Sequence, residues 1–130
     1  MLYIQLLLAA GVLSVHSVLS ISFKEATEAC TKIHGIDANM EKMDFKDPDF
    51  PQQKKCAVAC ILDKKDVFKD DGSIDIKKDK KLLEEALQDE ELREKYLKAV
   101  DECDIPVKKN KCETAYEFVK CKETNVRKMI

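Results

Sequence analysis

The stretch CAVACIL, residues 56–62, contains no polar side chain apart from its two cysteines. Three residues separate Cys56 from Cys60, so on an α-helix the two sulfurs lie one turn apart on the same face. A helix that is apolar on every face is buried among other elements. The stretch therefore predicts a central helix over residues 51–64, with Pro51 or Gln52 in its first turn.

The other cysteines extend this pattern along the chain of 130 residues. Six cysteines occur, and the gaps between successive cysteines hold 25, 3, 42, 8 and 8 residues. An even number in a short exported chain is typical of a disulfide framework. The eight residues between Cys112 and Cys121 place these sulfurs on opposite sides of a helix. We therefore expect helices that are cross-linked from several sides.

The N-terminus reads as a secretory leader. An apolar run at residues 6–13 is followed by small residues, and no charged side chain occurs before Lys24. This pattern predicts a cleaved signal peptide over residues 1–20 and one domain over residues 21–130. A membrane anchor is the alternative, which the shortness of the run disfavours. Export implies a secreted, extracellular protein whose cysteines are paired.

Charge argues against two classes of partner. The chain has 23 basic and 25 acidic residues and a net charge of −2. The lysines within residues 77–81 are flanked by acidic residues and predict a solvated helix face. We expect no nucleic-acid partner and no membrane insertion of the mature chain.

Composition predicts an all-α fold. Glycine and proline occur only three times each, and charged helix formers are abundant. Ser22 and Glu25 form a capping-box pattern at the start of the first helix. The helices are expected at residues 22–34, 37–43, 51–64, 76–87, 89–102 and 109–122. In the tail that follows, Val126, Met129 and Ile130 are expected either to close over a cavity or to fray.

A turn is expected at residues 69–75. Gly72 there suggests a calcium-binding loop, in which Val67, Lys69 and Lys78 would occupy ligand positions. None of these side chains supplies the oxygen ligand that calcium requires, so we expect a structural turn and no metal.

Helix geometry restricts the disulfide pairing. Six cysteines allow fifteen pairings. Cys56 and Cys60 lie about 6 Å apart at Cβ, beyond the reach of a disulfide, and Cys112 and Cys121 lie about 13.5 Å apart along an axis. Excluding these two bonds leaves about ten pairings, among which helix geometry does not choose.

The pattern Cys30-x25-Cys56-x3-Cys60-x42-Cys103-x8-Cys112-x8-Cys121 resembles that of the six-cysteine insect odorant-binding proteins, which include pheromone-binding and general odorant-binding proteins. The resemblance covers the whole mature chain, and the gaps of three and eight residues are its specific part. It implies a compact bundle of about six helices around an internal apolar cavity. It also implies the disulfides Cys30–Cys60, Cys56–Cys112 and Cys103–Cys121, which are among the pairings that geometry leaves open.

The resemblance further implies a carrier. Such a protein takes up a small hydrophobic molecule reversibly, by burying its surface at about 25 cal/mol per Å². The expected partners are that ligand and a membrane chemoreceptor, with no cofactor, and the expected state is a monomer or weak homodimer. The candidate lining residues are apolar positions left after the cysteines are assigned: Leu62, Phe68, Ile74, Leu83, Leu87, Tyr96, Val100, Ala115, Phe118 and Val119. Tyr96 or Tyr116 is expected to offer a hydroxyl to a ligand alcohol, ester or aldehyde, or else to solvent or backbone.

Three other functions are alternatives to a carrier of odorants. A small secreted phospholipase needs a His-Asp pair and a calcium loop, whereas the mature chain has only His34, beside Gly35 at a helix end. We therefore expect no enzyme and no catalytic residue. A saposin-like membrane-active protein has a different cysteine spacing. A carrier of other hydrophobic ligands, without a sensory role, uses the same binding physics.

Overall fold

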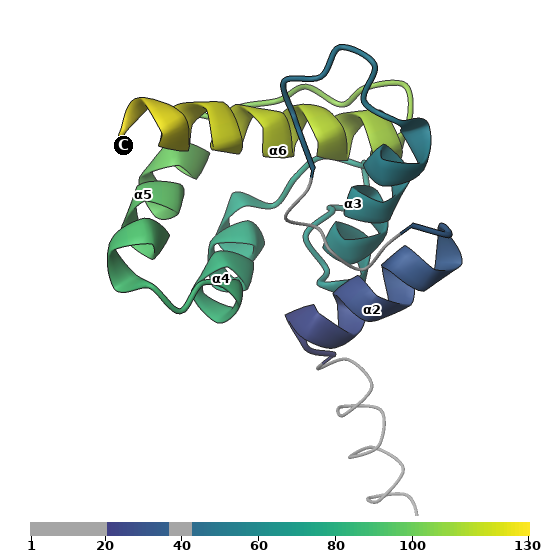
Figure 1. The fold of residues 1–130 in the computed structure, drawn as a ribbon, viewed down its shortest axis with the longest axis horizontal. Helices are drawn as coiled ribbons and strands as arrows, with labels where there is room; N and C mark the ends of the chain where they lie inside the picture. The colour runs from purple at the N-terminus through teal and green to yellow at the C-terminus, as the bar shows by residue number, and fades with distance from the viewer. Residues whose placement is uncertain (1–20, 37–42) are drawn as a thin grey trace, which may run out of the picture.

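The computed structural model describes residues 21–36 and 43–130. Within these residues the chain forms five helices and no strand (Figure 1), which confirms the prediction of an all-α fold. The helices are α2 (Phe23–Ile33), α3 (Gln52–Lys64), α4 (Ile76–Ala86), α5 (Glu90–Asp101) and α6 (Lys111–Lys128). The expected signal peptide, and the helix expected at residues 37–43 apart from Met43, lie outside the described residues.

Side-chain caps explain where four of these helices begin. Ser22, Asp75, Asp89 and Asn110 each accept a hydrogen bond from the backbone N–H three residues further on. Such caps satisfy N–H groups that the first helical turn leaves without partners. At the other end of α2, Gly35 has a φ of +63°, a left-handed conformation that glycine adopts without strain.

The turn expected at residues 69–75 is present. The N–H of Lys69 donates to the carbonyl oxygen of Ser73 at 2.8 Å, and an isolated bridge pairs Phe68 with Ile74. Gly72, at the tip of the turn, has a φ of +86°. The segment of residues 65–75, which ends in this turn, connects α3 to α4.

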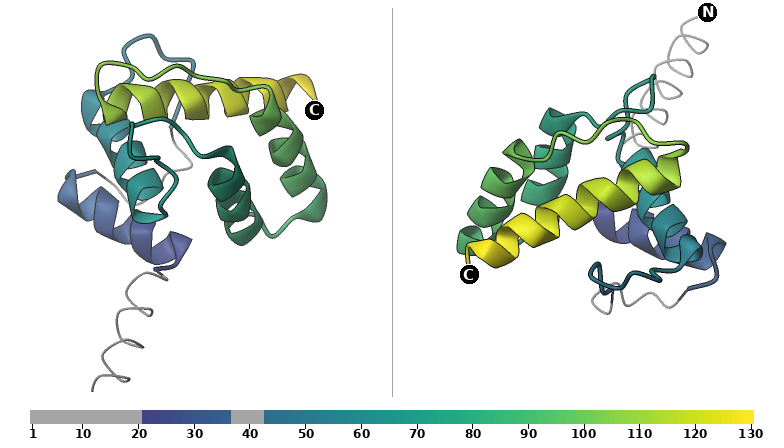
Figure 2. Two further views of the ribbon diagram at one scale, coloured as in Figure 1. Left: turned by 180° about the vertical axis from the view of Figure 1, so that it is seen from behind. Right: turned by 90° about the horizontal axis from the view of Figure 1, so that it is seen from above.

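The longest helix, α6, runs across the other helices (Figure 1). α3 packs against its N-terminal half and α5 against its C-terminal half, and α2 lies against α3 (Figure 2). α4 contacts α5 and α2 and lies between α3 and α5. The core beside α6 contains Phe118, Val100 and Val67, none of which is exposed.

Three disulfides connect these elements. Cys30–Cys60 joins α2 to α3, Cys56–Cys112 joins α3 to α6, and Cys103–Cys121 joins the segment after α5 to α6. These are the pairs that the resemblance implies. The central helix α3 is therefore bonded to two neighbours, whereas α4 contains no cysteine.

The end of α6 differs from the sequence-based expectation. The helix was expected to end at Lys122, but it continues for six more residues, to Lys128. The physical reason is tertiary contact, because Val126 is buried and the Asn125 side-chain amide donates to the carbonyl oxygen of Ala99 on α5 at 3.2 Å. The two alternatives for the tail were a lid over the cavity and a frayed end. In the structure α6 continues to Lys128, Val126 lies in the core, and Met129 and Ile130 are exposed.

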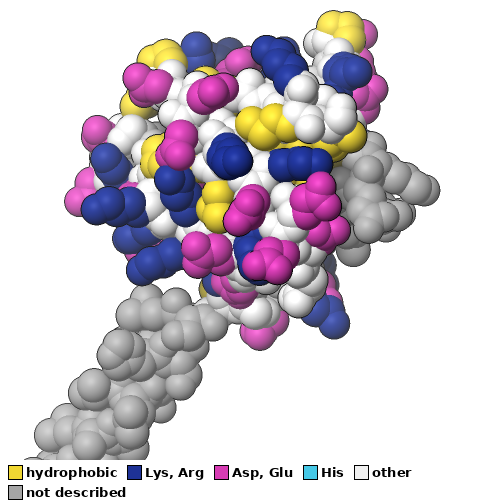
Figure 3. All heavy atoms as spheres, turned by 90° about the vertical axis from the view of Figure 1, so that its left-hand side faces the viewer, with side chains coloured by type: hydrophobic (Ala, Val, Ile, Leu, Met, Phe, Trp, Pro, Cys, Tyr) yellow, Lys and Arg dark blue, Asp and Glu magenta, His cyan; other side chains and the backbone are white. Residues whose placement is uncertain are grey.

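The surface is mixed in charge. On the face shown in Figure 3, basic and acidic side chains alternate, and hydrophobic side chains appear only as small separate areas. Among the residues that the structure describes, no helix combines the length and apolar composition needed to span a bilayer.

Candidate ligand-binding cavity

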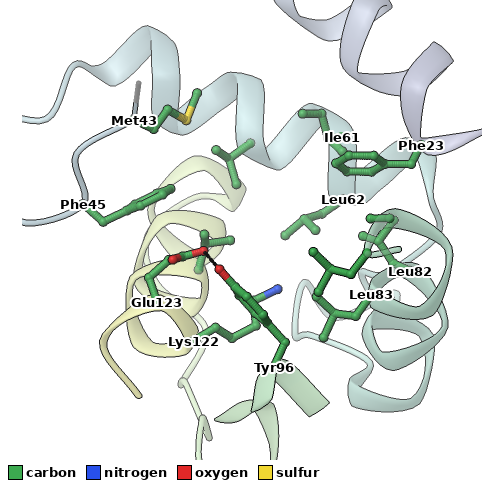
Figure 4. A pocket seen from close by; sticks show the side chains of 14 residues that line it. Phe23, Met43, Phe45, Ile61, Leu62, Leu82, Leu83, Tyr96, Lys122 and Glu123 are labelled. Carbon is green, nitrogen blue, oxygen red and sulfur yellow. Dashed lines mark hydrogen bonds between the residues drawn. The ribbon is translucent and has the colours of Figure 1, made fainter. Parts of the chain in front are cut away.

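An apolar cavity of about 260 Å³ lies where α3, α4, α5 and α6 face one another, and it is partly open to solvent (Figure 4). Its wall takes residues from every described helix and from the segment before α3. The lining residues are Phe23, Met43, Phe45, Val58, Ile61, Leu62, Leu82, Leu83, Ala86, Leu87, Tyr96, Val119, Lys122 and Glu123. Apart from three residues with polar groups, Tyr96, Lys122 and Glu123, the lining is hydrocarbon and thioether.

The wall on α3 is fixed by covalent bonds. The sulfurs of Cys56 and Cys60 hold α3 to α6 and α2, and the remaining apolar side chains of the helix point elsewhere. Val58, Ile61 and Leu62 face the cavity and are at most 5% exposed. The helix that is apolar on every face thus uses one face for disulfides and another for the cavity.

The wall on α4 is held without a covalent bond. Leu82, Leu83 and Ala86 lie on one side of this amphipathic helix, and Leu87 follows at its C-terminal cap. The opposite side of α4 carries exposed charged residues such as Lys77. Its position therefore depends on side-chain packing and on the polar contacts described below.

An aromatic cluster fixes the segment that precedes α3. The rings of Phe45 and Phe50 stack with their centroids 5.2 Å apart. The centroid of the Phe50 ring also lies 4.9 Å from that of Tyr116 on α6. The ammonium group of Lys55 lies over the Tyr116 ring, 4.4 Å from its centroid. Because Phe45 also lines the cavity, this cluster anchors the part of the wall opposite α4.

The polar part of the wall is formed by α5 and α6. The Tyr96 hydroxyl reaches into the cavity and donates a hydrogen bond to Glu123 Oε1 at 2.7 Å (Figure 4). Burial, together with the Glu123 carboxylate, raises the pKa of Tyr96 well above its ordinary value. The phenol therefore stays protonated at physiological pH and keeps its hydrogen bond to Glu123.

A buried ion pair lies beside this wall. Lys122 Nζ approaches the two carboxylate oxygens of Asp79 on α4 at 3.2 and 3.0 Å, and it lies 4.6 Å from the centroid of the Phe118 ring. Asp79 is not exposed and Lys122 is 5% exposed. Burial raises the pKa of Asp79, although the Lys122 ammonium opposes this shift. The pair links α4 to α6 in place of a disulfide.

Five of the ten candidate lining residues come together at this cavity: Leu62, Leu83, Leu87, Tyr96 and Val119. The other five lie elsewhere. Phe68, Ala115 and Phe118 are buried in the core, and Ile74 and Val100 line a second hollow next to the turn that ends at Asp75. Tyr116 belongs to the aromatic cluster and does not line the cavity.

Several lining residues were not singled out from the sequence. The sequence could have identified Val58 and Ile61 as lining residues, because the disulfides occupy the other side of their helix. It gives no indication that Lys122 and Glu123 line a cavity, since two neighbouring charged residues near the expected end of a helix are normally solvated. Phe45 lies in a segment without periodicity, and its place became evident only from the aromatic cluster.

The second hollow is larger, about 380 Å³, but its chemistry differs. Lys69, Asp101 and Asp104 contribute to its lining. Ligand cavities are lined mostly by apolar side chains with a few convergent polar groups, so the smaller cavity is the better candidate. In the part of the chain that the structure describes, no group of His, Cys, Asp and Glu side chains is arranged to hold a metal ion.

In a comparison with known protein families, residues 15–125 match the PBP/GOBP family. The matched span contains all six cysteines and every described residue that lines the cavity. A search of curated proteins found no match.

Proposed function

Because the chain belongs to the PBP/GOBP family of odorant-binding proteins, we propose that it reversibly binds a small hydrophobic molecule in the cavity between α3 and α4 and carries it through an aqueous fluid. The proposed cargo is an odorant, a pheromone or a similar semiochemical. Members of the family are binding proteins, which favours a carrier over an enzyme. The apolar lining is the single observation that carries the proposal.

Burial supplies the binding energy. A ligand that buries about ten methylene groups gains about 8 kcal/mol, at about 0.8 kcal/mol per group. Part of this gain offsets the loss of translational and rotational freedom on association. An affinity in the micromolar range or weaker is therefore expected. Such an affinity allows both uptake and release without a chemical step.

The proposed place of action is the extracellular fluid. The apolar leader at residues 1–20 is proposed to direct export and to be removed, which leaves residues 21–130 as the carrier. Three disulfides support this proposal, since disulfides persist in oxidising compartments. They also hold α2, α3 and α6 in place around a cavity that would otherwise destabilise the fold.

Displacement of a fluorescent apolar probe tests the proposal. The oxidised protein is titrated with N-phenyl-1-naphthylamine, and a panel of volatile and fatty compounds is then added to compete. We expect saturable enhancement of the probe's fluorescence and its loss on competition. The reduced and alkylated protein is the control, and it should bind the probe much more weakly because its helices are no longer cross-linked.

A probe that never binds to the oxidised protein, at any concentration below its own aggregation, would overturn the proposal. Leakage of lipid vesicles by the same preparation would instead favour the membrane-active alternative.

A further inference from the structure

The polar pair of the cavity wall offers acceptors rather than donors. The Tyr96 hydroxyl has a single hydrogen, and it donates this hydrogen to Glu123 Oε1 at 2.7 Å. A carboxylate has no hydrogen to donate, and its two oxygens have more acceptor sites than one phenol uses. The free hydrogen-bonding capacity of this pair is therefore that of an acceptor.

The nearby cations do not change this property. Two of the three N–H groups of Lys122 are taken by the carboxylate oxygens of Asp79, at 3.2 and 3.0 Å, and the ammonium also lies over the Phe118 ring, 4.6 Å from its centroid. Arg127, one turn beyond Glu123 on α6, is exposed. Among the ion pairs formed by the described residues, none includes Glu123. At the polar end of the cavity, the Glu123 carboxylate therefore forms no ion pair with any of the described residues.

We propose, on the premise that the cavity is the ligand site proposed above, that it selects hydrophobic molecules that carry one terminal O–H or N–H group over ethers and esters of the same size. The ligand's hydrogen is donated to the Glu123 carboxylate, and its hydrocarbon chain lies against Leu62 and Leu83. Hydrogen bonds to a charged acceptor are about twice as strong as neutral ones. A ligand oxygen that finds no donor at this end loses its hydration without compensation.

The proposal differs from one of the two expectations for Tyr96, namely that its hydroxyl is offered to a ligand alcohol, ester or aldehyde. Its only hydrogen already serves Glu123, so a ligand that can only accept must break that bond or remain unpaired. The phenol instead holds the carboxylate in position at the cavity wall (Figure 4).

Three volatile ligands with equal numbers of non-hydrogen atoms test the selection: octan-1-ol, heptyl methyl ether and nonane. Headspace measurements over the oxidised protein give a dissociation constant for each ligand. Binding of nonane reports the apolar cavity itself, and the ratio of alcohol to ether affinity reports the donor. We expect the alcohol to bind about tenfold more tightly than the ether.

Two variants assign the effect to the carboxylate. Glu123→Gln is expected to lower the ratio of alcohol to ether affinity several-fold, because the acceptor becomes neutral. The affinity of the same variant for nonane reports any change in the cavity itself, and the ratio corrects for that change. Tyr96→Phe is expected to keep or raise the ratio, since it frees an acceptor site on Glu123. The control, Glu94→Gln, makes the same charge change at an exposed position of α5 and should leave all three affinities unchanged.

Each outcome decides between the two proposals. Equal affinities for alcohol and ether, together with binding of nonane, would overturn the donor selection and keep the carrier function. Loss of the ratio in Tyr96→Phe would assign recognition to the phenol and also overturn the selection. Failure of all three ligands to bind would overturn the proposed function itself.

Discussion

The two helices that face each other across the cavity, α3 and α4, are held in different ways. α3 is joined by disulfides to α2 and α6, and five of its residues are buried. α4 contains no cysteine and is held by leucine packing, by the buried ion pair between Asp79 and Lys122, and by surface ion pairs such as that between Lys80 and Asp101. The cavity therefore has one covalently fixed wall, on α3, and one wall held without a covalent bond, on α4, which we call the adjustable wall.

The largest effect on stability is expected from removing a disulfide that holds α3, the fixed wall. Cys56→Ala/Cys112→Ala opens a bond between residues 56 positions apart and should lower the free energy of unfolding by about 4 kcal/mol in the chain-entropy account. Cys103→Ala/Cys121→Ala spans 18 positions and should lower it by about 3 kcal/mol. Urea denaturation measures both. A loss below about 1 kcal/mol for the first variant would show that α3 does not depend on its bond to α6.

The next effect concerns the adjustable wall. Lys122→Met leaves the buried Asp79 carboxylate without its cation and should lower the free energy of unfolding by about 3 kcal/mol at pH 8. Burial already raises the pKa of Asp79, and loss of Lys122 raises it further. A raised pKa in the folded state gives stability that is present at low pH and lost as the pH rises through that pKa. The penalty should therefore shrink between pH 8 and pH 5.

Two comparisons check this explanation. Asp79→Leu/Lys122→Met removes both charges and should recover most of the lost stability. Lys80→Met removes a lysine from the same region whose partner, Asp101, is 58% exposed, and it should lower stability by less than about 1 kcal/mol. A penalty for Lys122→Met that does not change with pH would contradict the role given to Asp79.

Filling the cavity from the adjustable wall affects binding more than stability. Ala86→Leu adds a larger side chain at a lining position of α4, in a residue type that favours helix. We expect affinity for nonane to fall about tenfold, equivalent to about 1.4 kcal/mol, with a small change in the free energy of unfolding. Glu84→Leu adds the same side chain on the exposed side of α4 and should leave the affinity unchanged. Equal losses in both variants would point to a general distortion of α4.

The smallest effects are expected from removing the N-terminal caps of α4 and α6, and they test whether the two helices open locally to the same extent. Asp75→Ala and Asn110→Ala each remove an N-terminal cap, from α4 and α6, and each should lower the free energy of unfolding by about 1 kcal/mol. The first turn of α6 includes Cys112, which is bonded to α3, so local opening is restricted there. Amide hydrogen exchange should therefore accelerate more in the first turn of α4. The same acceleration in both helices would argue against a difference in local stability.

Much of α3 and of its cysteine pattern could be predicted from the sequence, because both depend on residues close together in the chain. The run at residues 56–62 predicts α3, and the structure ends that helix at Lys64 as expected. The two spacings of three and eight residues also report helix faces. The pairing of the cysteines could not be derived in this way, since sulfurs far apart in sequence meet only in the folded chain.

The packing of α4, the end of α6 and the cavity were less predictable, because they depend on contacts between residues far apart in the sequence. Phe118 and Leu83 are equally apolar, but only Leu83 meets the cavity, since core and pocket walls share one composition. Asp79 and Lys122 lie 43 positions apart, and either alone predicts a solvated residue. The last turns of α6 depend on contacts with α5 that the polar sequence after Lys122 does not reveal.

Methyl-group NMR during titration with nonane tests most directly whether the space between the two walls is the binding site. If it is, the largest shifts and the contacts with the ligand should appear at the methyl groups of Leu62 on the fixed wall and of Leu83 and Leu87 on the adjustable wall. Shifts confined to Ile74 and Val100, at the more polar hollow, or the absence of any saturable shift, would contradict the account.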